Sequence, residues 1–343
     1  MRNSKTFFRV AAIAAVLVAL LAALDFLLYP CTFMRNDIHA VTTQTFDDIY
    51  VGTSHGKMNI DPSSVAEVTG RSGHNLCVGG EYSLDAYYLA RLILEKGHAP
   101  KRFVYEVSPG YFVSEKEEGN NYLLFYHEFP LSRSKLAYFA ESVAKCNLRT
   151  MFFPWYEYPL SYELKHLKET VRTKAGGDYS GANMKTDEQE YHADGFIERY
   201  PVDTSAFSTD DLETYDAGDI VQKNMDNLSR MIALCREHDI EFVAVMTPLP
   251  DETYGAGFDE YEELGAYYNA FFENEGVRFI NFNDDEHWDL TDHARENFTD
   301  LDGHMHGDAA RAFSRVLAAE LDPESAEEEE IEDAEEIELE ELG

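Results

Sequence analysis

Short apolar runs alternate with amphipathic stretches along this 343-residue chain, and this alternation constrains the fold more than any other feature. The runs have the length of buried strands, and the stretches between several of them have helical length. Strands that alternate with helices form a parallel sheet covered on both faces. We therefore expect an α/β fold, a three-layer sandwich with a mainly parallel sheet of about five strands. The expected strands are residues 47–51, 74–78, 102–107, 241–246 and 278–282, and the expected helices are residues 83–96, 219–238, 259–275 and 308–321.

A long insertion, from about residue 110 to 217, separates the third and fourth expected strands. Its first half has aromatic-rich stretches of helical pattern near residues 135–145 and 158–173. Its second half is polar and begins with a glycine-containing run, so we expect irregular loop there. Long loops of this kind tend to shape or cover binding sites.

The N-terminal sequence predicts a membrane anchor. Three basic residues, Arg2, Lys5 and Arg9, precede a long apolar segment that is interrupted only by Asp25. The segment is about long enough to cross a bilayer. Positive charge ahead of it favours an N-terminus on the cytoplasmic side. We therefore expect a cytoplasmic N-terminus over residues 1–9, a transmembrane signal anchor over residues 10–29 and an extracytoplasmic domain over residues 30–321.

Two other interpretations of this segment are weighed. A cleavable signal peptide has the same charged start and apolar core, but no small-residue cleavage site follows the core here. A lipoprotein would use Cys31, but Leu28, Tyr29 and Pro30 are not the small residues that precede a lipidated cysteine. A retained anchor is the preferred interpretation.

The chain is strongly acidic, with a formal net charge of −37. Residues 322–343 contribute thirteen of the negative charges and form a low-complexity run, which we expect to be a disordered acidic tail. A tail that docks on a basic partner is the alternative. The body is acidic as well, and this argues against nucleic acid as a partner because phosphate binding needs clustered lysine and arginine.

A serine stands directly after the first expected strand, in the sequence Gly52-Thr53-Ser54-His55. The glycine allows a sharp bend, and the serine then lies at the carboxyl edge of the sheet, where open α/β folds place their sites. A serine hydroxyl needs an imidazole to accept its proton and a carboxylate to orient that imidazole. A serine in this position can also simply cap the next helix.

The imidazole and the carboxylate are both present near the C-terminus, in Asp300-Leu301-Asp302-Gly303-His304. We expect Ser54 to act as nucleophile and His304 as base. Either Asp302 or Asp300 completes the triad, and Asp302 is slightly preferred because it is nearer to the histidine. The same groups could instead bind a divalent metal, but a metal site leaves Ser54 unexplained, so we expect neither a metal nor another cofactor.

These two blocks resemble those of the SGNH (GDSL-like) hydrolase superfamily, and more narrowly its membrane-anchored branch of DltD-like and alginate O-acetylation proteins. The resemblance implies an SGNH, flavodoxin-like fold. It also implies that a glycine of Gly79-Gly80 offers a backbone N–H to an oxyanion. His55 could line the same site. The asparagine that better-known members carry after the third strand is absent, since Ser108-Pro109-Gly110 stands there.

The resemblance implies acyl or acetyl transfer to a cell-envelope polysaccharide or teichoic acid, with a membrane O-acyltransferase as a partner. Hydrolysis of the same ester is the close alternative, because either a sugar hydroxyl or water can release an acyl-serine. A different class of function is a non-catalytic envelope scaffold. The missing asparagine and the unusual spacing of aspartate and histidine both favour that alternative.

Overall fold

Five parallel strands form the central sheet, in the order β2-β1-β3-β6-β7. The structure is a computed structural model that describes residues 2–116, 124–143, 155, 160–182, 184–209 and 212–323. The strand order is that of a doubly wound sheet, in which ligands bind beyond the carboxyl ends of the strands where the order reverses. Here the reversal lies between β1 and β3. The strands are β1 (Asp48–Val51), β2 (Gly73–Asn75), β3 (Arg102–Glu106), β6 (Glu241–Met246) and β7 (Arg278–Asn281).

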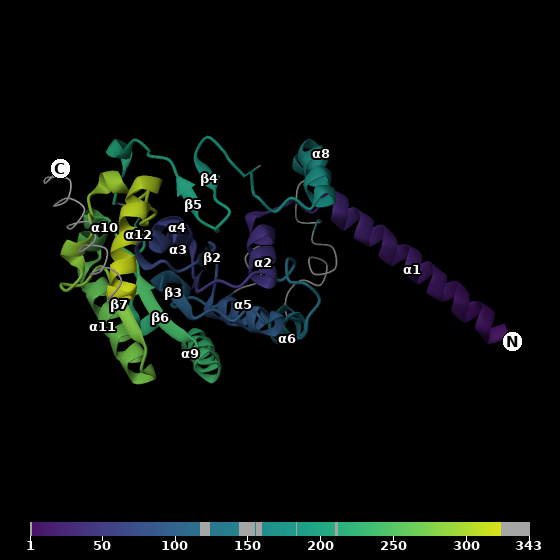
Figure 1. Ribbon diagram of the computed structural model, residues 1–343, viewed down its shortest axis with the longest axis horizontal. Coiled ribbons are helices and arrows are strands. Elements are labelled where there is room, and N and C mark those ends of the chain that lie inside the picture. Colours follow the sequence, from purple (N-terminus) through teal and green to yellow (C-terminus); the bar gives the residue numbers. More distant parts are fainter. Residues whose placement is uncertain are drawn as a thin grey trace, which may run out of the picture.

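Helices cover both faces of the sheet (Figure 1). Successive side chains of a strand point to opposite faces, so Ile49 and Val51 pack into one core and Tyr50 into the other. The first core lies under α2 (Phe33–Thr43), α5 (Ser83–Lys96), α9 (Gln222–Glu237) and α11 (Phe258–Glu275). The second lies under α4 (Pro62–Thr69) and α12 (Gly307–Leu321), against which α3 (Ser54–Asn59) also packs. The predicted α/β fold with a mainly parallel five-stranded sheet is confirmed.

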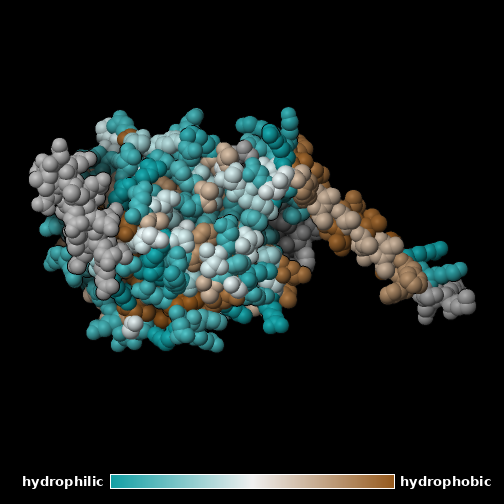
Figure 2. Space-filling view, viewed as in Figure 1, coloured by the Kyte–Doolittle hydropathy of each residue, from teal (hydrophilic) through white to brown (hydrophobic). Residues whose placement is uncertain are grey.

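The N-terminal helix α1 (Arg2–Leu28) projects away from the body, and its surface is mainly hydrophobic (Figures 1 and 2). Residues Lys5–Leu28 are long and apolar enough to cross a membrane, and no other helix of the described residues has both properties. Lys174 holds the end of this helix, because its Nζ donates to the carbonyl oxygens of Asp25, Phe26 and Tyr29. The predicted apolar helix is therefore present.

The insertion contains helices in its first half and a hairpin in its second. The helices are α6 (Arg133–Glu141) and α8 (Leu160–Gly176), and the antiparallel strands are β4 (Gln189–Tyr191) and β5 (Ile197–Arg199). The expectation of irregular loop in the second half was therefore wrong in part. The strands are only three residues long and are held by contacts with distant segments, such as the bond from the Asn75 N–H to the Asp194 carbonyl. No periodic pattern in the sequence could reveal them.

Shorter elements complete the fold. They are α10 (Asp251–Ala256) and the 3₁₀ helices η1 (Pro109–Tyr111), η5 (Thr204–Ala206), η6 (Ala217–Asp219), η7 (Trp288–Leu290) and η8 (Arg295–Asn297). The expected acidic tail lies outside the described residues from residue 324 onward. Residues 144–145 of the first expected helical stretch of the insertion and residues 158–159 of the second also lie outside them.

Candidate active site

A sharp turn after β1 places Ser54 at the carboxyl edge of the sheet. Gly52 has φ +144°, and a Cβ atom on it would lie 2.7 Å from the Cβ of Glu106, so only glycine fits there. Thr53 caps α3 by accepting from the His55 N–H. Ser54 is the first residue of that helix.

Ser54, His304 and Asp300 form one chain of hydrogen-bonded side chains. Ser54 Oγ lies 2.8 Å from His304 Nε2. On the other side of the ring, His304 Nδ1 lies 2.8 Å and 3.0 Å from the two carboxylate oxygens of Asp300. This geometry suits an imidazole that donates from Nδ1 and accepts the serine proton at Nε2.

The structure places Asp300, not the slightly preferred Asp302, against the His304 ring. A tight turn closes between Phe298 and Met305, with the Thr299 N–H donating to the His304 carbonyl. This turn brings Asp300 against the His304 ring, and the carboxylate also accepts from the His304 N–H at 3.1 Å. Asp302 is exposed, and its backbone carbonyl oxygen lies 2.7 Å from His55 Nε2, while Asp300 is the aspartate hydrogen-bonded to the His304 ring. Sequence distance alone was therefore a poor guide to which aspartate faces the ring.

Arg199, which the sequence interpretation missed, approaches the same carboxylate from the insertion. Its Nη1 lies 3.6 Å from Asp300 Oδ2. Burial of the Asp300 carboxyl favours its neutral form, but His304 and Arg199 outweigh this effect and hold its pKa below the usual range. Asp300 is therefore ionised at neutral pH, as an orienting carboxylate must be.

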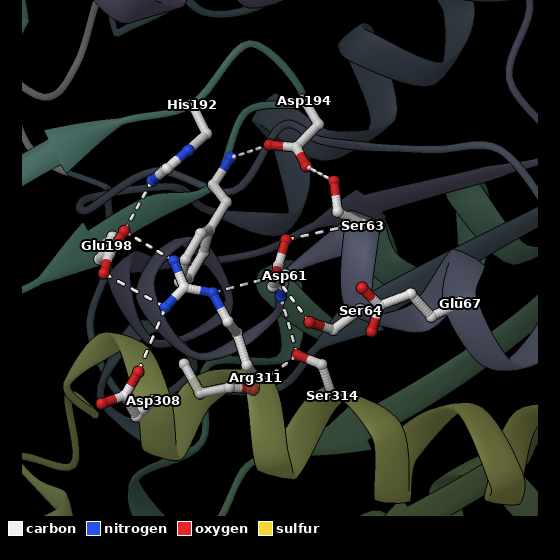
Figure 3. A network of polar contacts seen from close by, with 12 residues as sticks. Asp61, Ser63, Ser64, Glu67, His192, Asp194, Glu198, Asp308, Arg311 and Ser314 are labelled. Carbon is white, nitrogen blue, oxygen red and sulfur yellow. Dashed lines mark hydrogen bonds and ion pairs between the residues drawn. The ribbon is translucent and has the colours of Figure 1, made fainter.

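The hairpin that carries Arg199 is fixed to the body by a polar network (Figure 3). Arg311 of α12 donates to both carboxylate oxygens of Glu198, and His192 contacts the same carboxylate. Asp194 accepts from Ser63 at the start of α4. The hairpin therefore connects α4, which follows the Ser54 segment, with α12, which follows the His304 segment.

His55 stacks on the His304 ring, with ring centroids 4.6 Å apart and an interplanar angle of 13°. Its Nε2 lies 2.7 Å from the Asp302 carbonyl oxygen. Burial, together with the neighbouring His304, lowers the pKa of His55 to about 3. A neutral His55 donates to the Asp302 carbonyl and packs against one face of the His304 ring, and it lines the cavity beside Ser54.

The two expected oxyanion glycines differ in their surroundings. A Cβ atom on Gly79 would lie 3.8 Å from Ser54 Oγ, so this residue borders the nucleophile. Among the described residues, no acceptor is bonded to the Gly79 N–H. The Gly80 N–H donates to the Tyr111 hydroxyl at 3.1 Å. Of the two glycines, Gly79 is thus the one that borders Ser54, and the Gly80 N–H is already engaged.

Glu106, at the end of β3, is a second residue that the sequence interpretation missed. It is buried beneath the turn, and its Oε2 accepts from the Thr53 N–H at 2.6 Å and the Thr53 hydroxyl at 2.8 Å. Burial raises the pKa of Glu106, although the Thr53 donors oppose this. An acidic residue at the end of an apolar strand was the available signal.

A cavity of about 440 Å³ opens onto Ser54 and His304. The described residues that line it include no lysine or arginine. Three carboxyl groups, from Glu106, Glu213 and Asp302, border it, together with the aromatic rings of Tyr111, Tyr215 and Tyr261. Such a cavity accommodates an uncharged or cationic group better than an anionic one.

A metal could in principle use Asp300, Asp302 and His304, whose ligand atoms lie within 4.8 Å of one another. Both ring nitrogens of His304 already face side-chain partners, Asp300 and Ser54. To bind a metal, His304 would have to lose its contact with either Asp300 or Ser54. The arrangement suits proton transfer better than metal binding.

No protein-family model matches this chain, and no curated protein shows significant sequence similarity to it.

Proposed function

We propose that this protein is a membrane-anchored serine esterase or acyltransferase of the SGNH-like type, with Ser54, His304 and Asp300 as its triad. The observation that carries the proposal is the continuous chain of contacts from Ser54 Oγ through the imidazole to the Asp300 carboxylate. The doubly wound sheet and the position of Ser54 beyond β1 are compatible with that fold type.

The proposed reaction has two steps. His304 accepts the hydroxyl proton as Ser54 Oγ attacks the ester carbonyl, and the Gly79 N–H donates to the developing oxyanion. Collapse of this intermediate releases the alcohol, which takes the proton from His304, and leaves an acyl-serine. Water or a sugar hydroxyl then attacks the acyl group, and His304 again accepts the proton. The bond between the acyl group and Ser54 Oγ breaks, Oγ takes the proton back from His304, and a carboxylic acid or a new sugar ester is released.

The proposed setting is the outer face of a cell membrane, with α1 as a single-pass anchor. The basic residues ahead of the span favour an N-terminus inside. The substrates proposed are O-acyl groups, acetyl above all, on envelope polysaccharide or teichoic acid, and the proposed partner is a membrane O-acyltransferase. No cofactor is needed for this chemistry.

A non-catalytic scaffold is the second candidate. It is favoured by one observation, the lack of an asparagine among the described residues that line the cavity, since Ser108 follows β3. Turnover of an acetyl ester decides between the two candidates.

The test uses the full-length protein in detergent and an acetyl ester. Ser54→Ala and His304→Ala should each remove most of the activity, and the double variant should be scarcely worse because members of one catalytic unit are not additive. The exposed serine Ser205 provides the control, since Ser205→Ala should keep full activity. Equal activity of Ser54→Ala and wild type would rule out the proposed nucleophile.

A further inference from the structure

The segment next to the membrane anchor has the opposite charge to the rest of the chain. Residues 131–176 carry eight of the 28 lysine and arginine residues but only four of the 65 acidic residues, a charge of +4 in a chain of −37. The basic residues are Arg133, Lys135, Lys145, Arg149, Lys165, Lys168, Arg172 and Lys174, and the acidic ones are Glu141, Glu157, Glu163 and Glu169.

Of the two helices in the described part of this segment, α8 lies where α1 joins the body, and α6 lies beside α5 (Figure 1). Lys135 of α6 and Lys174 of α8 line one cavity, of about 740 Å³, together with Val18 and Leu21 of α1. Lys174 also holds the carbonyl end of α1, as described above. Because residues 18 and 21 belong to the apolar span, these helices must lie near the membrane surface if α1 crosses the bilayer.

The same two helices expose cations and large apolar side chains together. Arg133, Lys165, Lys168 and Arg172 are all exposed. Leu131, which just precedes α6, is 84% exposed, Leu136 is 61% exposed and Leu164 is 63% exposed. Exposed leucine beside lysine and arginine is the composition of surfaces that lie in a membrane interface, where apolar groups enter the lipid and cations meet the headgroups.

We infer that α6 and α8, with Leu131, form a membrane-binding surface that rests on anionic phospholipid. Lipid is the binding partner of this surface because the surface adjoins the membrane span and its positive charge complements anionic headgroups. The acidic remainder of the body is repelled by the same headgroups. The contact orients the domain relative to the bilayer. This inference rests on the proposed membrane span of α1 and is independent of catalysis.

The test is hydrogen–deuterium exchange on the full-length protein in lipid nanodiscs. One set of discs contains phosphatidylcholine alone, and the other contains phosphatidylcholine with phosphatidylglycerol. Amides of residues 131–141 and 164–176 should exchange several-fold more slowly in the anionic discs, and high salt should remove the difference because it screens surface charge. Equal exchange in both discs would overturn the inference and leave this surface to a protein partner.

A charge-neutral variant adds a second comparison. Arg133→Gln, Lys165→Gln, Lys168→Gln and Arg172→Gln combined should abolish the lipid-dependent protection. The matched control neutralises four exposed cations elsewhere, Lys101, Lys223, Arg236 and Arg315, and should behave as wild type. The salt dependence of the wild type keeps the inference testable if the variant misfolds. Failure of the protein to enter either disc would instead refute the span itself, and the inference with it.

Discussion

At the scale of single residues, the site depends on side chains that are 250 positions apart in the sequence, Ser54 and His304. Each is placed by a local turn, one after β1 and one before α12. Glycines with positive φ occur in both turns, Gly52 at +144° and Gly303 at +108°. The turns set the positions of the two side chains, and His304 and Arg199 lower the pKa of the Asp300 carboxyl beside them.

The geometry makes a clear prediction about the two aspartates. Asp300→Asn should lower kcat/KM by a factor on the order of 10³ to 10⁴, because an amide no longer fixes the required imidazole tautomer. Asp302→Asn should change it by less than about threefold, since that carboxylate is exposed and does not orient the ring. Steady-state kinetics of the two variants on one acetyl ester measure this difference. The opposite ranking would assign the orienting role to Asp302.

Arg199 should act through Asp300 rather than on substrate. Removing its charge in Arg199→Met should raise the pKa of Asp300, so the acid limb of the kcat/KM profile should move to higher pH. The carboxylate should also be held less firmly against His304, which should lower kcat/KM at neutral pH by roughly tenfold. Arg199→Lys keeps the charge and should restore much of the profile. A profile of unchanged shape in Arg199→Met would reduce Arg199 to a packing role. The exposed Arg315 provides a control, Arg315→Met.

That Ser54 and His304 lie together could be predicted from sequence because strand, glycine and serine occur together, and because histidine and aspartate recur near the chain end. The orienting aspartate could not be chosen, since the choice depends on how the turn between Phe298 and Met305 closes. Arg199 carried no signal at all. It belongs to no motif and reaches Asp300 only because a hairpin a hundred residues upstream folds against α12.

At the scale of elements, the β4–β5 hairpin connects the insertion with both halves of the site. Its strands are too short to be stable alone, because an isolated hairpin is marginal in water. The ion pair of Glu198 with Arg311 and the contact of Glu198 with His192 supply the missing contacts. Arg311 holds the pKa of Glu198 below its usual range, and His192 adds to this effect despite partial burial.

Loss of the Glu198 contacts with Arg311 and His192 should loosen the hairpin. Glu198→Ala should make residues 186–200 exchange amide hydrogens faster and should lower kcat through displacement of Arg199, while costing only about 1 kcal/mol of overall stability because the pair is partly exposed. Hydrogen exchange and kinetics on the same samples measure both effects. Glu188→Ala, on the exposed side of the same hairpin, is the control. Unchanged exchange across residues 186–200 would show that other contacts suffice.

At the scale of the whole molecule, the alternation of strands and helices sufficed to predict the layered body. The sheet strands are buried on both faces and therefore appear as apolar runs of the right length. The helices α2, α3 and α4 were not predicted. Helices α3 and α4 are short, and α2 buries only two large apolar side chains, Ile38 and Val41, so its helical pattern is weak. Buried polar residues beneath the site also gave no periodic signal.

One of those residues, Glu81, should make stability depend on pH. Burial raises its pKa well above the ordinary value of 4.5, and the nearby Asp85 adds to this. The folded form therefore binds the proton more tightly than the unfolded form. Protonation of Glu81 therefore stabilises the folded form, and this contribution is fully present below pH 4.5. It is lost as pH rises towards the pKa that Glu81 has in the folded protein.

Glu81→Gln cannot titrate, so its stability relative to wild type should increase with pH. We expect a gain of a few degrees in the thermal midpoint at a pH of about 8 and little gain at a pH of about 4. Thermal unfolding of both proteins in the same detergent at each pH measures the difference. A gain that is the same at both pH values would mean that the ionised form of Glu81 carries no penalty in the folded protein.

Whether Ser54 is an activated nucleophile can be measured directly with a serine-reactive phosphonate, followed by mass spectrometry of the full-length protein. The account predicts one adduct, on the peptide that contains Ser54, which is absent in Ser54→Ala and forms much more slowly in His304→Ala and Asp300→Asn because the hydroxyl then lacks an oriented base. An unmodified Ser54 in the wild type, or labelling that is independent of His304, would contradict it and favour the non-catalytic scaffold.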